Sequence, residues 1–226
     1  MHVTDLDKAL RSTLAILVKV EPGQLDAPTP CASWDVRALI NHFIGTAHWW
    51  AGVIGGAGED GGGGTAVDYA AGDYVAAYTE AVKIAVAAFG ADDVPGRSVR
   101  LPFGEFPGAV LRDLAAMEHF VHGWDLARAI GYSADLDPDL AAALLSMARL
   151  AITDAFRGPD GQALFGPVVE APAGAGPADQ LVAFLARQGP DQKAVLRRKI
   201  VVDEEDVHFL GQPAQATLFA SHQFRC

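Results

Sequence analysis

Three side chains, His42, Glu118 and His122, have the types and the spacing of ligands for one divalent metal ion. Glu118 and His122 are four residues apart, so on an α-helix they lie one turn apart on the same face. A carboxylate oxygen and an imidazole nitrogen presented in this way can bind one ion, and a third ligand from a facing helix completes the set. Three protein ligands leave coordination positions open for water or substrate, which is typical of catalytic metal sites.

His42 is placed to be this third ligand. The apolar residues around it recur at helical spacing: Val36, Leu39, Ile40 and Phe43. At about 100° per residue, His42 lies on the flank of this apolar stripe, whereas His48 lies about 120° further toward solvent. On the later helix, Glu118 and His122 lie beside the apolar face, and His119 points roughly 100° away. We therefore expect only one histidine of each pair to border the core.

The spacing alone leaves a second interpretation open. Glu118 and His122 then form an ordinary helix-surface pair, because such pairs at four-residue spacing also arise by chance. His42 is then a boundary histidine whose hydrogen bonds are satisfied.

Two residues that follow His122 are candidates to support a site. Asp125 lies on the same stripe and is either a hydrogen-bond partner of a ligand or a fold-stabilising residue. Arg128 lies near the centre of the apolar face, where an unpaired charge is costly, so we expect it to pair with Asp125 or with an anionic ligand. Cys31 precedes a predicted helix, and we expect it to be an inert buried cysteine.

The segments that contain these residues show mostly helical periodicity. It predicts helices over 4–20, 34–53, 74–89, 108–130 and 138–156, and a short helix around 181–185. Residues 98–106 predict a short extended excursion or hairpin around Gly104, and the glycine-rich run 55–64 predicts a surface linker. This order predicts an all-α helical bundle over 1–190. The residue composition changes after Pro190 and the helical periodicity is lost, so 191–226 is predicted to be a C-terminal extension that can contain strand.

Composition restricts the classes of partner. The 226 residues carry 17 Lys and Arg against 28 Asp and Glu, a net charge of -11, which argues against nucleic acid and anionic membranes. The first residues lack a charged and then apolar leader, and the two cysteines, Cys31 and Cys226, cannot form a disulfide framework. We therefore expect a cytoplasmic protein with reduced cysteines. Oligomeric state stays open, and a homodimer is compatible with the sequence.

Two segments resemble the signature helices of the DinB-like superfamily. The first is Ser33-Trp34-Asp35-Val36-Arg37-Ala38-Leu39-Ile40-Asn41-His42, preceded by Pro30-Cys31. The second is Glu118-x-x-x-His122-Gly123-Trp124-Asp125-Leu126-Ala127-Arg128-Ala129. Within the superfamily, the chain is most similar to the N-terminal, metal-binding domain of mycothiol-dependent maleylpyruvate isomerases, over roughly Asp5 to Arg187. The resemblance implies a four-helix bundle and a metal, usually zinc, bound by His42, Glu118 and His122.

The resemblance also implies thiol chemistry. Relatives use a low-molecular-weight thiol such as mycothiol to modify a small electrophile, or to isomerise a double bond by thiol addition, rotation and elimination. The expected protein is thus a metal-dependent thiol transferase or isomerase. The isomerases carry a separate C-terminal domain that helps to build the active site, whereas this sequence offers only the stretch after Pro190, so we do not expect maleylpyruvate itself to be the substrate. Two alternatives need the same ligands or the same fold: a metal-dependent hydrolase, and a non-catalytic binding module that contains a metal.

Overall fold

The computed structural model describes residues 1–31, 34–56, 67–101, 104–158 and 165–185. Of these described residues 65% are helical, and the strands form one small two-stranded sheet. The expected all-α class is therefore confirmed. The predicted extension over 191–226 and most of the predicted glycine-rich linker lie outside the described residues.

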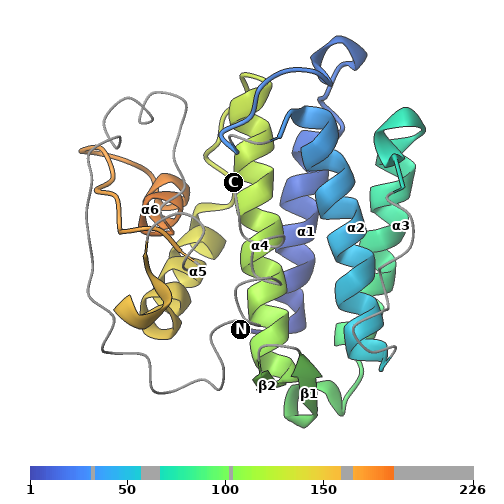
Figure 1. Ribbon diagram of the computed structural model, residues 1–226, viewed down its shortest axis with the longest axis vertical. Helices are drawn as coiled ribbons and strands as arrows, with labels where there is room; N and C mark the ends of the chain where they lie inside the picture. The colour runs from blue at the N-terminus through green and yellow to red at the C-terminus, as the bar shows by residue number, and fades with distance from the viewer. Residues whose placement is uncertain (32–33, 57–66, 102–103, 159–164, 186–226) are drawn as a thin grey trace.

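Four long helices form the bundle: α1 (Val3–Leu17), α2 (Val36–Gly55), α3 (Tyr74–Phe89) and α4 (Gly108–Ala129). Figure 1 shows α1 and α4 running upward and α2 and α3 running downward. Helix α1 packs on α4 and α3, and α2 packs on α3 and α4. The two helices that carry the predicted ligands, α2 and α4, therefore lie side by side in the bundle.

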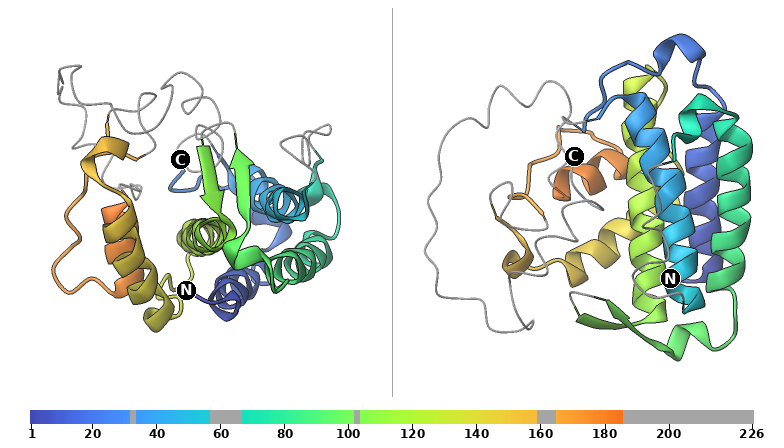
Figure 2. Two further views of the ribbon diagram at one scale, coloured as in Figure 1. Left: turned by 90° about the horizontal axis from the view of Figure 1, so that it is seen from below. Right: turned by 45° about the vertical axis from the view of Figure 1, so that its right-hand side comes forward.

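The remaining elements lie at the end and the side of the bundle. A hairpin of β1 (Ser98–Leu101) and β2 (Gly104–Pro107) lies below the helices, and α5 (Pro138–Ala151) and α6 (Pro177–Phe184) pack together beside α4 (Figure 2). Short 3-10 turns lie in the connections between the helices and strands: η1 (Pro22–Gln24), η2 (Tyr69–Ala71), η3 (Val94–Gly96) and η4 (Asp154–Phe156). The predicted helix over 138–156 thus ends five residues early, at Ala151, and a separate 3-10 turn follows it.

Aspartates begin three of the helices. Asp35, Asp73 and Asp137 each accept a hydrogen bond from a backbone N–H of the first turn, which satisfies a donor that has no partner within the helix. At the other end of α2, Gly56 has φ 84°, a left-handed conformation that glycine adopts without steric cost. These caps fix the start and the end of α2, and with them the position of His42.

Helix α4 is the central helix of the molecule. Every residue from Ala115 to Ala127 is buried, because α1, α2, α5 and α6 all contact this helix. The prediction of a single apolar stripe on α4 is therefore wrong. A helix that is buried all round has no solvent face, and its polar side chains must find partners inside the protein.

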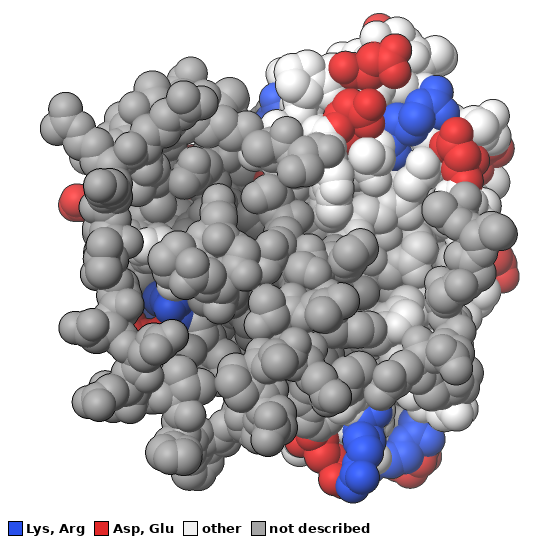
Figure 3. All heavy atoms as spheres, in the orientation of Figure 1, with Lys and Arg blue, Asp and Glu red and all other residues white. Residues whose placement is uncertain are grey.

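The described surface carries both signs of charge. On the face drawn in Figure 3, acidic and basic side chains intermingle at the two ends of the bundle. Arg37 pairs with Asp68 at 3.0 Å, and Arg100 pairs with Glu105 at 3.2 Å. Among the described residues, no helix has the length and apolar character that a membrane span requires.

Candidate metal centre

His42, Glu118 and His122 meet between α2 and α4. One ligand atom from each side chain lies within 4.8 Å of the others. The side chains of Glu118 and His122 are fully buried, and that of His42 is 12% exposed. The predicted group is therefore brought together, and one of its members borders solvent.

The polar atoms of this group suit a cation. Nε2 of His42 lies 3.3 Å from Oε1 of Glu118, and both atoms are buried without a hydrogen-bond partner among the described residues. A buried carboxylate oxygen that accepts no hydrogen bond is costly unless a positive charge compensates it. Two imidazole nitrogens and one carboxylate oxygen form a donor set typical of zinc and similar divalent ions. The residues therefore fit a bound divalent metal.

The segment before α2 places an indole against the two histidines. Thr29 donates its hydroxyl to the backbone oxygens of Cys31 and Trp34, at 3.0 and 2.8 Å, and this closes a tight loop ahead of Asp35. The Trp34 ring centroid lies 4.4 Å from that of His42 and 5.7 Å from that of His122. Trp34 is half-buried, so its ring forms a wall of the site on a side that reaches the surface.

A second tryptophan binds the carboxylate. The indole N–H of Trp50, on α2, donates to Oε2 of Glu118 at 2.7 Å, and Trp50 is 3% exposed. Trp50 is not among the site residues that the sequence predicts. Spacing within one helix cannot predict this bond, because it joins α2 to α4 across the core.

Asp125 contacts the other buried ligand. Its Oδ2 lies 3.1 Å from Nδ1 of His122, and both side chains are fully buried. A carboxylate in contact with one ring nitrogen fixes the tautomer of a histidine, and it would raise the basicity of the other nitrogen if that atom bound a metal. Asp125 is thus the hydrogen-bond partner of the candidate ligand His122, the position that the first of its two predicted roles requires.

Arg128 lies elsewhere than expected. It is exposed, and its guanidinium lies over the Trp124 ring, 5.6 Å from the centroid. The prediction that Arg128 occupies the centre of a buried face and pairs with Asp125 is therefore wrong. The physical reason is that burial of α4 ends at Ala127, so the next residue reaches solvent while its side chain folds back one turn onto Trp124.

His119 is buried, contrary to the helical-wheel prediction. It is 1% exposed, and its Nδ1 lies 3.2 Å from the hydroxyl of Tyr78, while Thr13 donates to its backbone oxygen at 2.6 Å. Burial, with the nearby His122 and His42, lowers the pKa of His119 to about 3. Burial also raises the pKa of Tyr78 above its ordinary range. Both side chains are therefore neutral at pH 7 and form a second polar group between α1, α3 and α4.

Cys31 also contacts Asp125. Its Sγ lies 3.5 Å from Oδ2 of Asp125, and together with His122 these residues form a second group whose potential ligand atoms lie within 4.8 Å of one another. Cys31 is fully buried, as expected for this position. The other cysteine, Cys226, lies outside the described residues.

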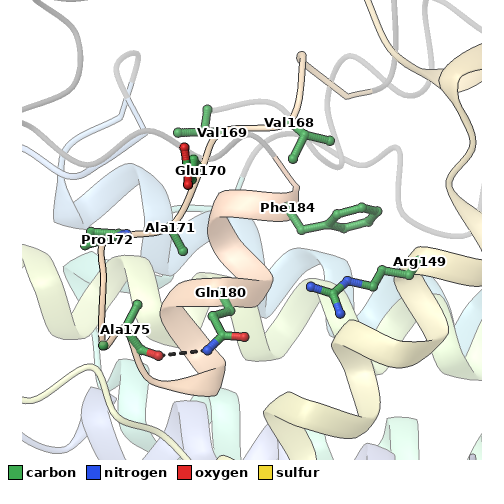
Figure 4. A pocket seen from close by; sticks show the side chains of 10 residues that line it. Arg149, Val168, Val169, Glu170, Ala171, Pro172, Ala175, Gln180 and Phe184 are labelled. Carbon is green, nitrogen blue, oxygen red and sulfur yellow. Dashed lines mark hydrogen bonds between the residues drawn. The ribbon is translucent and has the colours of Figure 1, made fainter.

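A separate pocket of about 370 Å³ lies between α5, α6 and the segment before α6 (Figure 4). Arg149 and Phe184 line it together with Gln180, which donates to the backbone oxygen of Ala175 at 2.8 Å. None of its lining residues belongs to the His42 group. Its Arg149 is exposed to solvent, so the pocket lacks the buried, uncompensated polar atoms that mark the group between α2 and α4.

Comparisons with known proteins agree with this geometry. Residues 6–127, which contain all three candidate ligands, match the family described as the mycothiol maleylpyruvate isomerase N-terminal domain. Two uncharacterized proteins of Mycobacterium tuberculosis, from strains CDC 1551/Oshkosh and H37Rv, are each 37% identical over 177 residues, which is 76% of this chain and 90% of each relative. No solved structure gives a significant match. The chain therefore belongs to the mycothiol maleylpyruvate isomerase N-terminal domain family.

Proposed function

We propose that the protein is a metal-dependent enzyme that uses a low-molecular-weight thiol such as mycothiol to modify or isomerise a small electrophilic substrate. His42, Glu118 and His122 bind the ion, which we propose to be zinc. The observation that carries this proposal is the meeting of three potential ligands from two helices within 4.8 Å, with a buried glutamate oxygen that accepts no hydrogen bond from the described residues.

The ligand set determines what chemistry is available. A divalent ion bound there lowers the pKa of a thiol at an open coordination position, so that thiolate forms at neutral pH. Two neutral histidines and one carboxylate leave one net positive charge on such a centre, which favours an anionic sulfur. The protein residues hold the geometry: Asp125 orients His122, and Trp50 binds the outer oxygen of Glu118.

Trp34 supports an entry route on the His42 side. His42 is the partly exposed ligand, and the half-buried Trp34 ring lies next to it. An aromatic wall excludes water from one side of the reacting sulfur and offers an apolar face to the substrate. The side chains of Glu118 and His122 are fully buried, so His42 is the member of the set that a small molecule would reach first.

Metal content tests the proposal directly. We would purify the protein without a metal-affinity tag and compare the wild type with His42→Ala, Glu118→Ala and the matched control His48→Ala by elemental analysis. The proposal expects near-stoichiometric metal in the wild type and in His48→Ala, and its loss in the other two variants. A wild type that holds no metal even after incubation with zinc contradicts the proposal and leaves a helical binding module.

Turnover with and without thiol then separates the two catalytic classes. A transferase or isomerase converts an electrophile only when the thiol is present. A metal-dependent hydrolase with the same ligands forms its product in water alone. Thiol-independent hydrolysis by the metal-loaded protein would contradict the thiol chemistry while leaving the metal centre intact.

A further inference from the structure

Glu118 has two carboxylate oxygens with different surroundings. Oε2 accepts a hydrogen bond from the Trp50 indole at 2.7 Å, whereas Oε1 faces Nε2 of His42 at 3.3 Å and accepts no hydrogen bond from the described residues. The indole N–H is a donor only and carries no charge. The protein therefore holds one oxygen away from the space between the histidines and presents the other to it.

We propose that Trp50 is a positioning residue that restricts Glu118 to binding the metal through one oxygen, and that it thereby keeps a coordination position open for the thiol. This inference rests on the proposed function, because it assumes that an ion binds the three ligands. It assigns a role to a side chain on α2 that acts only through the carboxylate on α4.

The coordination number follows from this bond. Carboxylates bind metal ions through one oxygen or through both. With Trp50 in place, the protein contributes three donor atoms, and a tetrahedral ion has one position left for an incoming sulfur. Without the indole N–H, Oε2 is a buried oxygen that has lost its donor, and this is costly unless Oε2 turns to the ion. The fourth position would then be filled by the protein itself.

Cobalt(II) is a suitable probe, because its visible absorption bands report the coordination number of the bound ion. We would load the wild type, Trp50→Phe and Trp49→Phe with cobalt and titrate each with 2-mercaptoethanol, following the near-ultraviolet band of the cobalt–sulfur bond. Trp49 is the matched control, because it carries the same side chain one position away and is not among the partners of Glu118.

The expected results differ between the two variants. In Trp50→Phe the visible bands weaken and shift, and the affinity for mercaptoethanol falls by about tenfold, because Oε2 would fill the position that the thiol takes in the wild type. Trp49→Phe retains the spectrum and the thiol affinity of the wild type. Identical spectra and titrations for the wild type and Trp50→Phe overturn the role of Trp50 but do not contradict the proposed metal centre. If the wild type takes up no cobalt, the proposed function itself fails.

A measurement on the wild type keeps the inference testable if Trp50→Phe does not fold. The infrared difference spectrum between zinc-loaded and zinc-free protein contains the two carboxylate stretches of the ligating glutamate, and Glu118→Gln identifies them by their loss. A wide separation between the stretches is the mark of binding through one oxygen and is the expected result. A narrow separation shows binding through both oxygens and overturns the inference.

Discussion

Glu118 and His122, the two buried members of the proposed ligand set, each have a buried hydrogen-bond partner. Asp125 contacts Nδ1 of His122, and Trp50 donates to Oε2 of Glu118. Such bonds restrict rotation about the last side-chain torsions, so less conformational entropy is lost when an ion binds. His42 has no comparable bond among the described residues, and it borders the surface next to Trp34. Of the three side chains, His42 on α2 is thus the one that borders solvent.

Replacing Asp125 tests this arrangement at the scale of one residue. We expect Asp125→Ala to weaken zinc affinity by about 10–100-fold, because His122 loses the partner that orients its ring, and we expect Asp125→Asn to fall between this variant and the wild type. Zinc affinity is measured by competition with a chromogenic chelator. The control is Asp113→Asn, an aspartate on the same helix that pairs with Arg112 and the N-terminus. Equal affinities for the wild type and Asp125→Ala would show that Asp125 only stabilises the fold.

The meeting of His42, Glu118 and His122 could be predicted from the sequence because their relation is partly local. Glu118 and His122 lie one turn apart on any α-helix, and the stripe before His42 orients α2. The donor bond from Trp50 and the burial of His119 could not be predicted in this way. Both depend on which helices surround α4, and an isolated helix carries no information about its neighbours.

At the scale of the elements, the second polar group between α1, α3 and α4 makes stability depend on pH. The pKa of His119 is about 3 in the folded protein, against an ordinary value of 6.5. Between these values the unfolded chain binds the proton and the folded chain does not. Burial of neutral His119 therefore contributes stability above about pH 6.5, and this contribution is lost as the pH falls toward 3.

We expect the free energy of unfolding of the metal-free protein to fall with pH in this window, with a contribution from His119 of up to about 1.4 kcal/mol per pH unit. Urea unfolding between pH 7 and pH 4 measures it. The free energy of unfolding falls less steeply with pH in His119→Gln, because this variant has no titrating side chain at position 119. Tyr78→Phe is the control, because it leaves His119 buried and should retain the slope. Parallel curves for the wild type and His119→Gln would contradict a buried neutral histidine.

The contact between α1 and α4 depends on a glycine. A Cβ atom at Gly123 would lie 2.6 Å from Oγ1 of Thr13 and 3.2 Å from its Cα, so the helices would have to move apart. We expect Gly123→Ala to destabilise the protein by about 1–3 kcal/mol. Gly45→Ala on α2 is the control, because nothing lies within 4 Å of its Cβ, and it should stabilise by up to about 1 kcal/mol through helix propensity. Equal effects in thermal unfolding would contradict the close approach of the helices.

The elements themselves were largely predictable, and the exceptions have a physical cause. The helix over 74–89 is confirmed, because its periodicity acts locally. The paired strands are also present, but Gly104 is the first residue of β2, where it pairs with Leu101, and the hairpin is therefore not centred on it. The single apolar face predicted for α4 is wrong because α5 and α6 cover the side that a simple four-helix bundle would leave to solvent. Trp124 makes this contact specific, since its indole N–H donates to Asp179 of α6 at 2.7 Å.

At the scale of the whole molecule, the proposed metal centre links two halves of the bundle. His42 comes from α2, and Glu118 and His122 come from α4, so the ligands are separated by most of the family-matched segment. In the unfolded chain these residues are far apart and bind an ion weakly. Binding to the folded state alone then adds to the stability of the entire bundle.

We therefore expect zinc to stabilise the wild type against unfolding as a whole. Free zinc at about 100 times Kd should add about 2.7 kcal/mol to the free energy of unfolding. For a protein of this size, that corresponds to a rise in Tm of roughly 5–10 °C. Differential scanning calorimetry of metal-free protein titrated with zinc measures the shift, and His48→Ala should show it in full. His42→Ala should lose most of it, since only the pair on α4 remains and the ion no longer joins the two helices. A shift of equal size in His42→Ala would mean that zinc stabilises the protein at another position, and the assignment of His42 as a ligand would then be wrong.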